Sequence, residues 1–318
     1  MAVDSSADVP PPSTPPTPER LLSEFEAFEE ALAADRTIAV AGEPYAGRGA
    51  LLSHAADALG AERVRLDPTD PGRIRAEIGG GPLVVDDCQQ LYTRRIGGFD
   101  LLRDVLTALS DADHAVVTGW NDRAWAYLDQ VESVGEVFAE SFSIRQFSPD
   151  ELEAYVRDRR EVPEIEGDNL GDSIVSTDDR TWRGISVPSL DFGVLNDQIW
   201  PTPEPTKSFF SRLCALSRGN PGVALAVFDR ASRDGVSPSD LETPAVDLDE
   251  TGDFLLRLLL AGERSDSEIL ADRVGERYGR LLGRLDRAGI TSRDGDSVIL
   301  TPVGVPTAVE RTERRRIL

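Results

Sequence analysis

The alternation of short apolar runs with helically spaced apolar residues predicts an α/β domain in the first half of the chain. Residues 38–41 and 83–85 are the clearest buried strands, because each is an uninterrupted apolar run. Further strands are expected at 63–66, 115–118 and 143–145. Apolar residues at helical spacing predict helices at 19–34, 50–59, 99–109, 209–218 and 223–230, a short one at 73–78, and another from Glu151 with Ser148 as its N-cap.

The pattern changes near the C-terminus, where three helices and a hairpin are predicted. The helices are expected at 253–260, at 265–274 with Ser265 or Asp266 as the cap, and at 276–288. A hairpin of 290–293 and 297–301 follows, around the turn Asp294-Gly295-Asp296. Three helices followed by a hairpin are typical of a winged helix-turn-helix, whose third helix commonly lies in the major groove of DNA.

Composition sets the expected boundaries between these parts. Residues 1–18 contain PPPSTPPTP and are expected to form a disordered tail. The α/β core is predicted at 19–147 and a helical segment at 148–230, with a polar insertion at 161–206. Residues 231–249 read as a linker, and 250–318 as the winged-helix domain.

The most informative stretch joins the first strand to the next helix. It has the spacing Gly42-x-x-x-x-Gly47-Arg48-Gly49, which matches the glycines of a Walker A loop. Such a loop binds phosphate because its N–H groups converge at a helix N-terminus. Arg48 occupies the position of the phosphate-binding lysine, and Gly49 that of the Ser or Thr that holds Mg²⁺. The sequence therefore predicts a phosphate site that has lost part of its chemistry.

Two acidic residues end the strand at 83–85, as in a Walker B motif. In that motif the first acid, here Asp86, holds Mg²⁺, and the second, here Asp87, can polarise the attacking water. The alternative is an acidic turn that only terminates the strand. Thr118 ends the strand at 115–118 and Asn121 follows it, at the position where P-loop enzymes place a sensor of the γ-phosphate. Turn-forming polar residues are also common at that position.

The order of these motifs over residues 19–230 resembles the AAA+ and STAND-type P-loop NTPases. The resemblance implies an open five-stranded parallel sheet followed by a helical lid, with ATP or ADP and Mg²⁺ as ligands. It also implies that Pro221, in Gly219-Asn220-Pro221-Gly222, lies near the adenine, and that Gly222 replaces a sensor arginine. Three outcomes remain open: active hydrolysis, nucleotide binding with little turnover, or a scaffold with an empty site.

The chain is strongly acidic, and its charge is unevenly distributed. The net charge is −23 and Lys207 is the only lysine, which resembles the acidic, arginine-rich proteins of haloarchaea. Residues 251–318 depart from this trend, since they carry +1 and the remaining chain −24. The N-terminus lacks the features of a signal peptide, and no apolar run of about 18 residues occurs. Both observations favour a cytoplasmic protein without a membrane span.

Arginines recur along one face of the third C-terminal helix. They are spaced three, four and three residues apart, which keeps them in one stripe: Arg277, Arg280, Arg284 and Arg287. In a chain this acidic, the stripe favours contacts with the phosphates of double-stranded DNA. The alternatives are a solvated face with ion pairs and a face that docks on protein. Arg314, Arg315 and Arg316 are either a second DNA backbone contact or a frayed tail.

The sequence thus predicts a nucleotide-binding, DNA-associated ATPase or regulator, with weak hydrolysis left open. The alternative is a non-catalytic adaptor in which the degenerate NTPase fold and the winged helix serve protein contacts or self-association.

Overall fold

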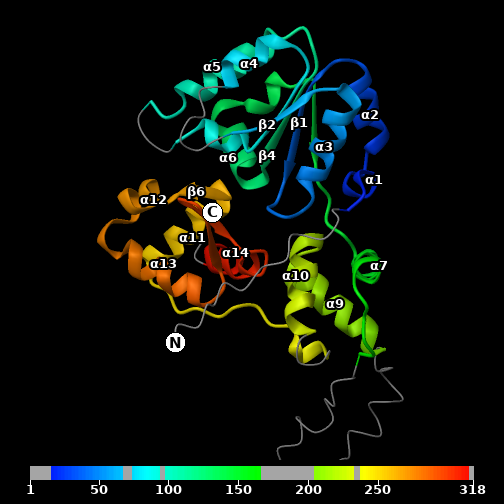
Figure 1. Ribbon diagram of the computed structural model, residues 1–318, viewed down its shortest axis with the longest axis vertical. Coiled ribbons are helices and arrows are strands. Elements are labelled where there is room, and N and C mark those ends of the chain that lie inside the picture. Colours follow the sequence, from blue (N-terminus) through cyan, green and yellow to red (C-terminus); the bar gives the residue numbers. More distant parts are fainter. Residues whose placement is uncertain (1–15, 67–73, 94–96, 166–203, 233–236, 315–318) are drawn as a thin grey trace, which may run out of the picture.

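A five-stranded parallel sheet forms one end of the molecule (Figure 1). The computed structural model describes residues 16–66, 74–93, 97–165, 204–232 and 237–314. The sheet order is β2-β3-β4-β1-β5, and every pairing in it is parallel. The strands are β1 (Thr37–Gly42), β2 (Glu62–Arg65), β3 (Leu83–Asp86), β4 (Val116–Asn121) and β5 (Glu140–Ser143). This is the parallel α/β sheet that the sequence predicts.

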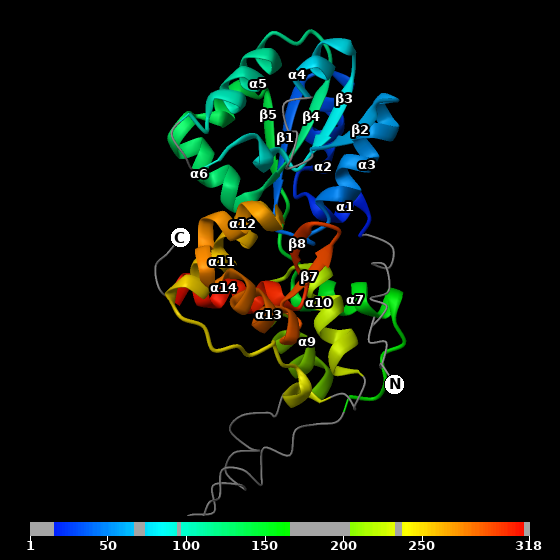
Figure 2. The ribbon, with the colours of Figure 1, turned by 60° about the vertical axis from the view of Figure 1, so that its left-hand side comes forward.

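Both faces of the sheet are covered by helices, which is why its central strands read as continuous apolar runs. On one face, Ile38, Val40, Val84, Val117 and Phe142 pack in a buried cluster with α2 (Phe25–Ala33) and α3 (Arg48–Leu59). On the other face, Ala39, Val85, Val116 and Trp120 pack with α5 (Asp100–Ser110) and α6 (Asp122–Glu132). The shorter helices α1 (Pro18–Leu21) and α4 (Ile74–Glu77) lie at opposite ends of the sheet domain, with α1 at the end that faces the lower half of the molecule (Figure 2).

Three helices follow the sheet and form what we call the helical lid: α7 (Pro149–Arg159), α9 (Pro205–Ser217) and α10 (Pro221–Ala231). Ser148 caps α7 as predicted, within a reciprocal capping box with Glu151. Asn220 caps α10, so this helix begins two residues before the predicted start. Most of the predicted insertion, 166–203, lies outside the described residues, as do residues 1–15 of the predicted tail.

The remaining elements form the C-terminal module, defined here as Glu250–Arg314. Its helices are α11 (Glu250–Gly262), α12 (Ser267–Val274), α13 (Tyr278–Arg287) and α14 (Gly304–Arg314). The strands β6 (Arg264–Asp266), β7 (Thr291–Asp294) and β8 (Ser297–Leu300) form an antiparallel sheet in the order β6-β8-β7. The three helices and the hairpin follow the predicted order for a winged helix-turn-helix. Asp266 caps α12, whereas Ser265 lies in β6.

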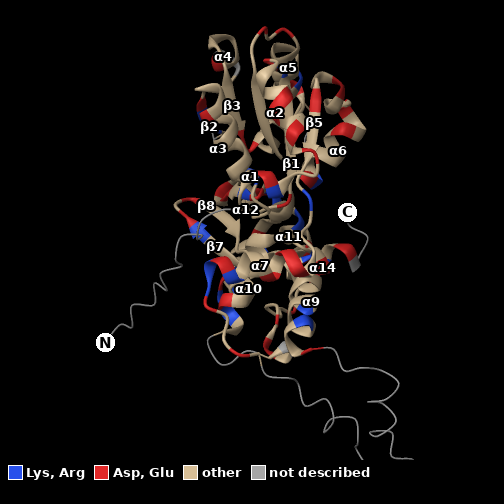
Figure 3. Cartoon of the chain, turned by 90° about the vertical axis from the view of Figure 1, so that its right-hand side faces the viewer, with Lys and Arg blue, Asp and Glu red and all other residues tan. Residues whose placement is uncertain are grey.

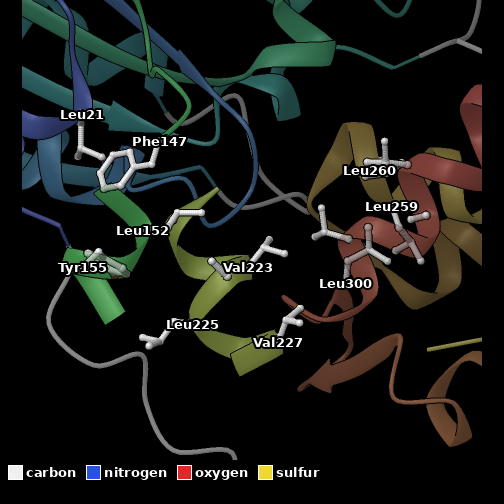
Figure 4. Close-up of a cluster of buried hydrophobic side chains, with 14 of the residues drawn as sticks. Leu21, Phe147, Leu152, Tyr155, Val223, Leu225, Val227, Leu259, Leu260 and Leu300 are labelled. Atoms are coloured by element: carbon white, nitrogen blue, oxygen red, sulfur yellow. The ribbon is translucent and has the colours of Figure 1, made fainter. Parts of the chain in front are cut away.

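The lid and the C-terminal module share one apolar cluster with the sheet domain. Figure 4 shows Val223 and Val227 of α10 between Leu152 of α7 and the Leu259 and Leu300 side chains of the module. All of these side chains are buried and belong to a single cluster that also contains Leu21 and Phe147. The module is therefore packed against the rest of the chain and not merely tethered to it.

Several predicted boundaries were wrong, for local reasons. The predicted helix 19–34 is split, because Leu22 adopts an extended conformation between α1 and α2. The fifth strand lies at Glu140–Ser143 rather than 143–145, in register with Ile38–Ala41 of β1. Helices α6 and α14 were not predicted. Within the described residues, the helices are too short or too polar to cross a membrane.

The lid approaches the loop after β1 closely enough that only glycine fits at position 222. A Cβ atom there would lie 2.5 Å from the backbone oxygen of Tyr45. We expect Gly222→Ala to lower the free energy of unfolding by about 1–3 kcal/mol, because backbone must move to admit the methyl group. Denaturant titration measures this loss.

Gly283→Ala in α13 is the matched control, since a Cβ there meets nothing within 4 Å. It should raise stability by about 0.5–1 kcal/mol, as alanine does in open helical positions. Equal midpoints for Gly222→Ala and the unsubstituted protein would mean that the lid does not rest on the loop.

Candidate functional site

The polar ends of three neighbouring strands meet at one edge of the sheet. Asp86 closes β3, Asn121 closes the neighbouring β4, and the glycine loop follows β1, which pairs with the other side of β4. In open parallel sheets, ligands bind at this carboxyl edge. The fold therefore brings together most of the site residues that the sequence singled out.

Arg48 lies at the centre of this edge and is almost fully buried. It is the first residue of α3, and its guanidinium contacts two adjacent carboxylates at the end of β3. Its Nε donates to Asp86 Oδ1 at 3.0 Å, and its Nη2 donates to Asp87 Oδ1 at 2.9 Å. Only 7% of the Arg48 side chain and 3% of each carboxylate side chain is exposed. Arg48 thus directly neutralises the two acidic residues for which the sequence predicts a Walker B role.

A third carboxylate reaches Arg48 from the C-terminal module. Glu263, which follows α11, binds it in a bidentate manner: Arg48 Nη1 lies 2.6 Å from Oε1 and Nη2 lies 3.0 Å from Oε2. Asn121 Nδ2 also donates to Glu263 Oε1 at 3.0 Å. Gln90 Nε2 donates to the carbonyl oxygens of Gly262 and Arg264, each at 2.9 Å. Side chains at the sheet edge therefore bind both the Glu263 carboxylate and the backbone of residues 262–264.

Two further arginines complete the cluster. Arg63 Nη2 donates to Asp86 Oδ2 at 2.8 Å, and its Nη1 donates to the carbonyl of Gly49 at 3.1 Å. Arg65 Nε lies 2.8 Å from Asp87 Oδ2. The sequence reasoning missed Arg63, Arg65, Gln90 and Glu263. The only signal for the two arginines was their alternation along β2, the neighbour of β3, and no local pattern marks Glu263.

Three non-glycine residues of the site have backbones in the left-handed region. They are Tyr45 with φ 67°, Asp87 with φ 61° and Glu263 with φ 58°. Such conformations cost about 1–3 kcal/mol each and persist where the surroundings enforce them. The Tyr45 hydroxyl donates to the carbonyl of Leu300, which is a second contact between the glycine loop and the module. Strain thus concentrates where the module meets the loop.

The ionisation of the acids follows from burial and from these neighbours. Burial opposes ionisation of Asp86, but Arg48 and Arg63 outweigh it and hold its pKa below the usual value. Burial, reinforced by Asp86 and Glu263, raises the pKa of Asp87 to about 6. Asp122, the first residue of α6, has its pKa raised to about 6 by burial and by nearby Glu43 and Glu263. The Arg48 guanidinium remains charged, since Glu263 and Asp86 outweigh its burial and raise its pKa.

The other predicted site residues have different surroundings. Gly42 ends β1 and its carbonyl faces Arg48, while Gly47 caps α3 with φ 109°. Pro221 begins α10 and is buried, and Asn220 Nδ2 donates to the carbonyl of Pro44 at 2.8 Å. Thr118 does not join the cluster, because its hydroxyl donates to the Ile38 carbonyl and accepts from Trp120 Nε1.

The arginine stripe lies on the C-terminal module. Arg280 and Arg284 belong to α13, and Arg277 belongs to the 3₁₀ turn before it. With Asp249 and Leu281 they line a hollow of about 180 Å³. Arg277 donates to Asp249 at 2.8 Å, and Arg287 folds back onto the Gly283 carbonyl. Within the described residues, Arg280 and Arg284 form no hydrogen bond or ion pair. Figure 3 shows acidic segments on α2, α5 and α6 and a basic segment near β7.

Comparisons with known proteins give matches in structure only. No protein-family model matches the sequence, and the search of curated proteins found no similar sequence. One aligned structure is the RuvB Holliday junction branch migration motor of Thermotoga maritima. It has 15% identity over 93% of this chain and 97% of that one, with a TM-score of 0.38.

Two further aligned structures come from Aeropyrum pernix. Its ORC2 protein, solved with ADPNP and ADP, has 11% identity, 96% and 97% coverage and a TM-score of 0.39. ORC1 of the same organism, in complex with DNA, has 14% identity, 97% and 96% coverage and a TM-score of 0.35. These chains superpose on ours only partly, so the fold assignment rests on strand order and on the position of the glycine loop.

The raised pKa of Asp122 gives stability a pH dependence of known sign. The pKa of Asp122 in the folded state is about 6, which exceeds the ordinary 3.8. The stability that the protonated carboxyl contributes is therefore fully present below pH 3.8 and is lost as pH rises through about 6. At pH 7.5, Asp122→Asn should therefore be more stable than the unsubstituted protein, by on the order of 1–3 kcal/mol. The advantage should shrink toward pH 4.5. Thermal unfolding across this range measures it, and a pH-independent difference would contradict it.

Proposed function

We propose that this protein is a nucleotide-responsive regulator that associates with DNA. In this proposal, the phosphates of ATP or ADP and the carboxylate of Glu263 compete for Arg48 in the glycine loop. The bound nucleotide releases the C-terminal module, and its absence allows the module to dock. Hydrolysis is slow or absent.

The bidentate contact between Glu263 and Arg48 carries this proposal. A carboxylate and a phosphate present similar pairs of oxygens to a guanidinium fork, so one can replace the other. Asn121, the candidate γ-phosphate sensor, donates to the same Glu263 oxygen that Arg48 Nη1 contacts. Glu263 therefore contacts both the loop residue and the sensor candidate that a terminal phosphate group would contact.

The same contacts argue for weak turnover. Asp87, the candidate for polarising water, is bound by Arg48, Gln89 and Arg65. Its oxygens are thus engaged with protein donors instead of facing a water molecule. Catalysis of phosphoryl transfer depends on positioning and charge stabilisation, and both are altered when Arg48 replaces lysine and Gly49 replaces a hydroxyl residue.

The DNA component rests on the arginine stripe. Arg280 and Arg284 line an open hollow and lack protein acceptors in the described part of the chain. Guanidinium groups in this state are suited to phosphate oxygens. They lie on the third helix of the module, which is the helix that enters the major groove in winged helix-turn-helix proteins.

A non-catalytic adaptor is the second candidate, and one observation favours it. Arg48, Arg63 and Arg65 balance the charges of Asp86, Asp87 and Glu263, so the cluster is neutral and hydrogen-bonded without any ligand. In an adaptor, this cluster would fix the module permanently and the arginine face would bind a protein partner.

Removing the Glu263 carboxylate separates the two candidates. Glu263→Ala should tighten ADP binding by about tenfold, because the nucleotide no longer displaces a charge-assisted contact. Isothermal titration calorimetry measures the affinity. Hydrogen exchange at 259–264 should rise on adding ADP to the unsubstituted protein, as the module is released.

Glu268→Ala is the matched control, since Glu268 is an exposed acid of the same module, on α12. It should leave ADP affinity and exchange unchanged. If neither the unsubstituted protein nor Glu263→Ala binds nucleotide while both remain folded, the adaptor is correct and the regulator is not.

The DNA component has its own test. Each lost phosphate contact lowers the slope of log K against log salt by about 0.9, so Arg280→Ala with Arg284→Ala should lower it by roughly 2. Fluorescence anisotropy on a DNA duplex gives the slope. The double change Arg36→Ala with Arg103→Ala removes equal charge from the sheet domain and should leave the slope unchanged. An unsubstituted protein that binds no duplex even at low salt would refute DNA association.

A further inference from the structure

In P-loop NTPases, Mg²⁺ is held by the Ser or Thr of the loop and by the Walker B acid. Neither ligand is available in this chain. Mg²⁺ requires near-octahedral oxygen ligands at about 2.0–2.1 Å. The oxygens of Asp86 and Asp87 and the space beside Gly49 do not meet that requirement.

The oxygens of Asp86 accept hydrogen bonds from protein groups. Oδ1 accepts from Arg48 Nε at 3.0 Å and from the Asp87 backbone N–H at 2.8 Å. Oδ2 accepts from Arg63 Nη2 at 2.8 Å. A metal ion at Oδ1 would displace the buried guanidinium of Arg48, and one at Oδ2 would displace the partly exposed guanidinium of Arg63. Neither group can lose its charge by deprotonation.

The second acid is engaged in the same way. Asp87 Oδ1 accepts from Arg48 Nη2 at 2.9 Å and from Gln89 Nε2 at 3.1 Å. Its Oδ2 lies 2.8 Å from Arg65 Nε. The two acids therefore hold three guanidinium groups in place of a cation.

The missing hydroxyl at Gly49 is explained by the same cluster. A Cβ atom at Gly49 would lie 3.3 Å from Arg63 Nη2, so the Arg63 guanidinium occupies the space beside the position of the lost side chain. Arg63 is fixed there by the Gly49 carbonyl at 3.1 Å and by the Ser53 hydroxyl at 2.8 Å. Glycine at position 49 and arginine at position 63 thus belong to one arrangement.

We propose that this glycine loop binds a nucleoside di- or triphosphate free of divalent cations, with Arg48, Arg63 and Arg65 supplying the positive charge that Mg²⁺ supplies elsewhere. The inference rests on the proposed function, because it concerns the ligand for which Glu263 leaves Arg48. Once Glu263 leaves, the three arginines exceed Asp86 and Asp87 by one positive charge. Glu43 and Asp122 lie close to each other near this edge and oppose a polyanion, which keeps the affinity moderate.

The test is calorimetric titration of ADP and ATP into the full-length protein and into Glu263→Ala. It is run with excess EDTA or excess Mg²⁺ at matched ionic strength. We expect Mg²⁺ to leave the affinity unchanged or to lower it, so that any strengthening by Mg²⁺ stays within about threefold. Strengthening by Mg²⁺ beyond that factor overturns the inference and leaves the proposed function standing. Absence of binding to either folded protein overturns both.

A double variant tests whether Arg63 is the reason that the loop binds nucleotide without Mg²⁺. Arg63→Ser with Gly49→Thr removes the guanidinium and adds the missing hydroxyl, so Mg²⁺ should now strengthen ATP binding by about tenfold. Arg36→Ala is the control, since Arg36 pairs with Glu140 on the surface and touches none of the cluster. Arg36→Ala should behave as the unsubstituted protein. A double variant that binds ATP equally with and without Mg²⁺ overturns the assignment to Arg63.

Discussion

The structure depends on one buried charge, the guanidinium of Arg48. Removing a partner from a buried ion pair typically costs about 3–5 kcal/mol, because the other charge is left uncompensated. Here that charge serves three carboxylates, Asp86, Asp87 and Glu263, which come from two elements of the chain that are far apart in sequence. The glycine loop, the acidic strand end and the C-terminal module are consequently coupled through a single side chain.

This coupling gives a physical reason for an arginine at position 48 of the glycine loop. Replacement of lysine by arginine is not a conservative change, because a planar fork with five donors can serve several carboxylates at once. Arg48 uses that fork within the protein, and its contact to Glu263 is the one that reaches the C-terminal module. A point charge such as lysine could not form the same set of directed contacts.

Strained backbone conformations occur on both sides of the contact between the glycine loop and the C-terminal module. Tyr45 and Glu263 have positive φ values on opposite sides of the contact between loop and module. Both side chains cross that contact, through the Tyr45 hydroxyl and the Glu263 carboxylate. The apolar cluster that includes Val227, Leu259 and Leu300 holds the two sides together and makes the strained conformations tolerable.

The sequence by itself determined the parallel sheet, the glycine loop, the acidic pair at 86–87, and the first three helices and the hairpin of the C-terminal module, but not α14. Apolar periodicity and glycine spacing are local signals, so they can be recognised in a single sequence. Only the tertiary structure decided that Arg63, Arg65 and Glu263 join Arg48, since these residues reach one another through strand order and module packing. Arg48 and Glu263 are 215 residues apart in the sequence, so no periodic pattern connects them. The two side chains meet only because the folded chain brings them together.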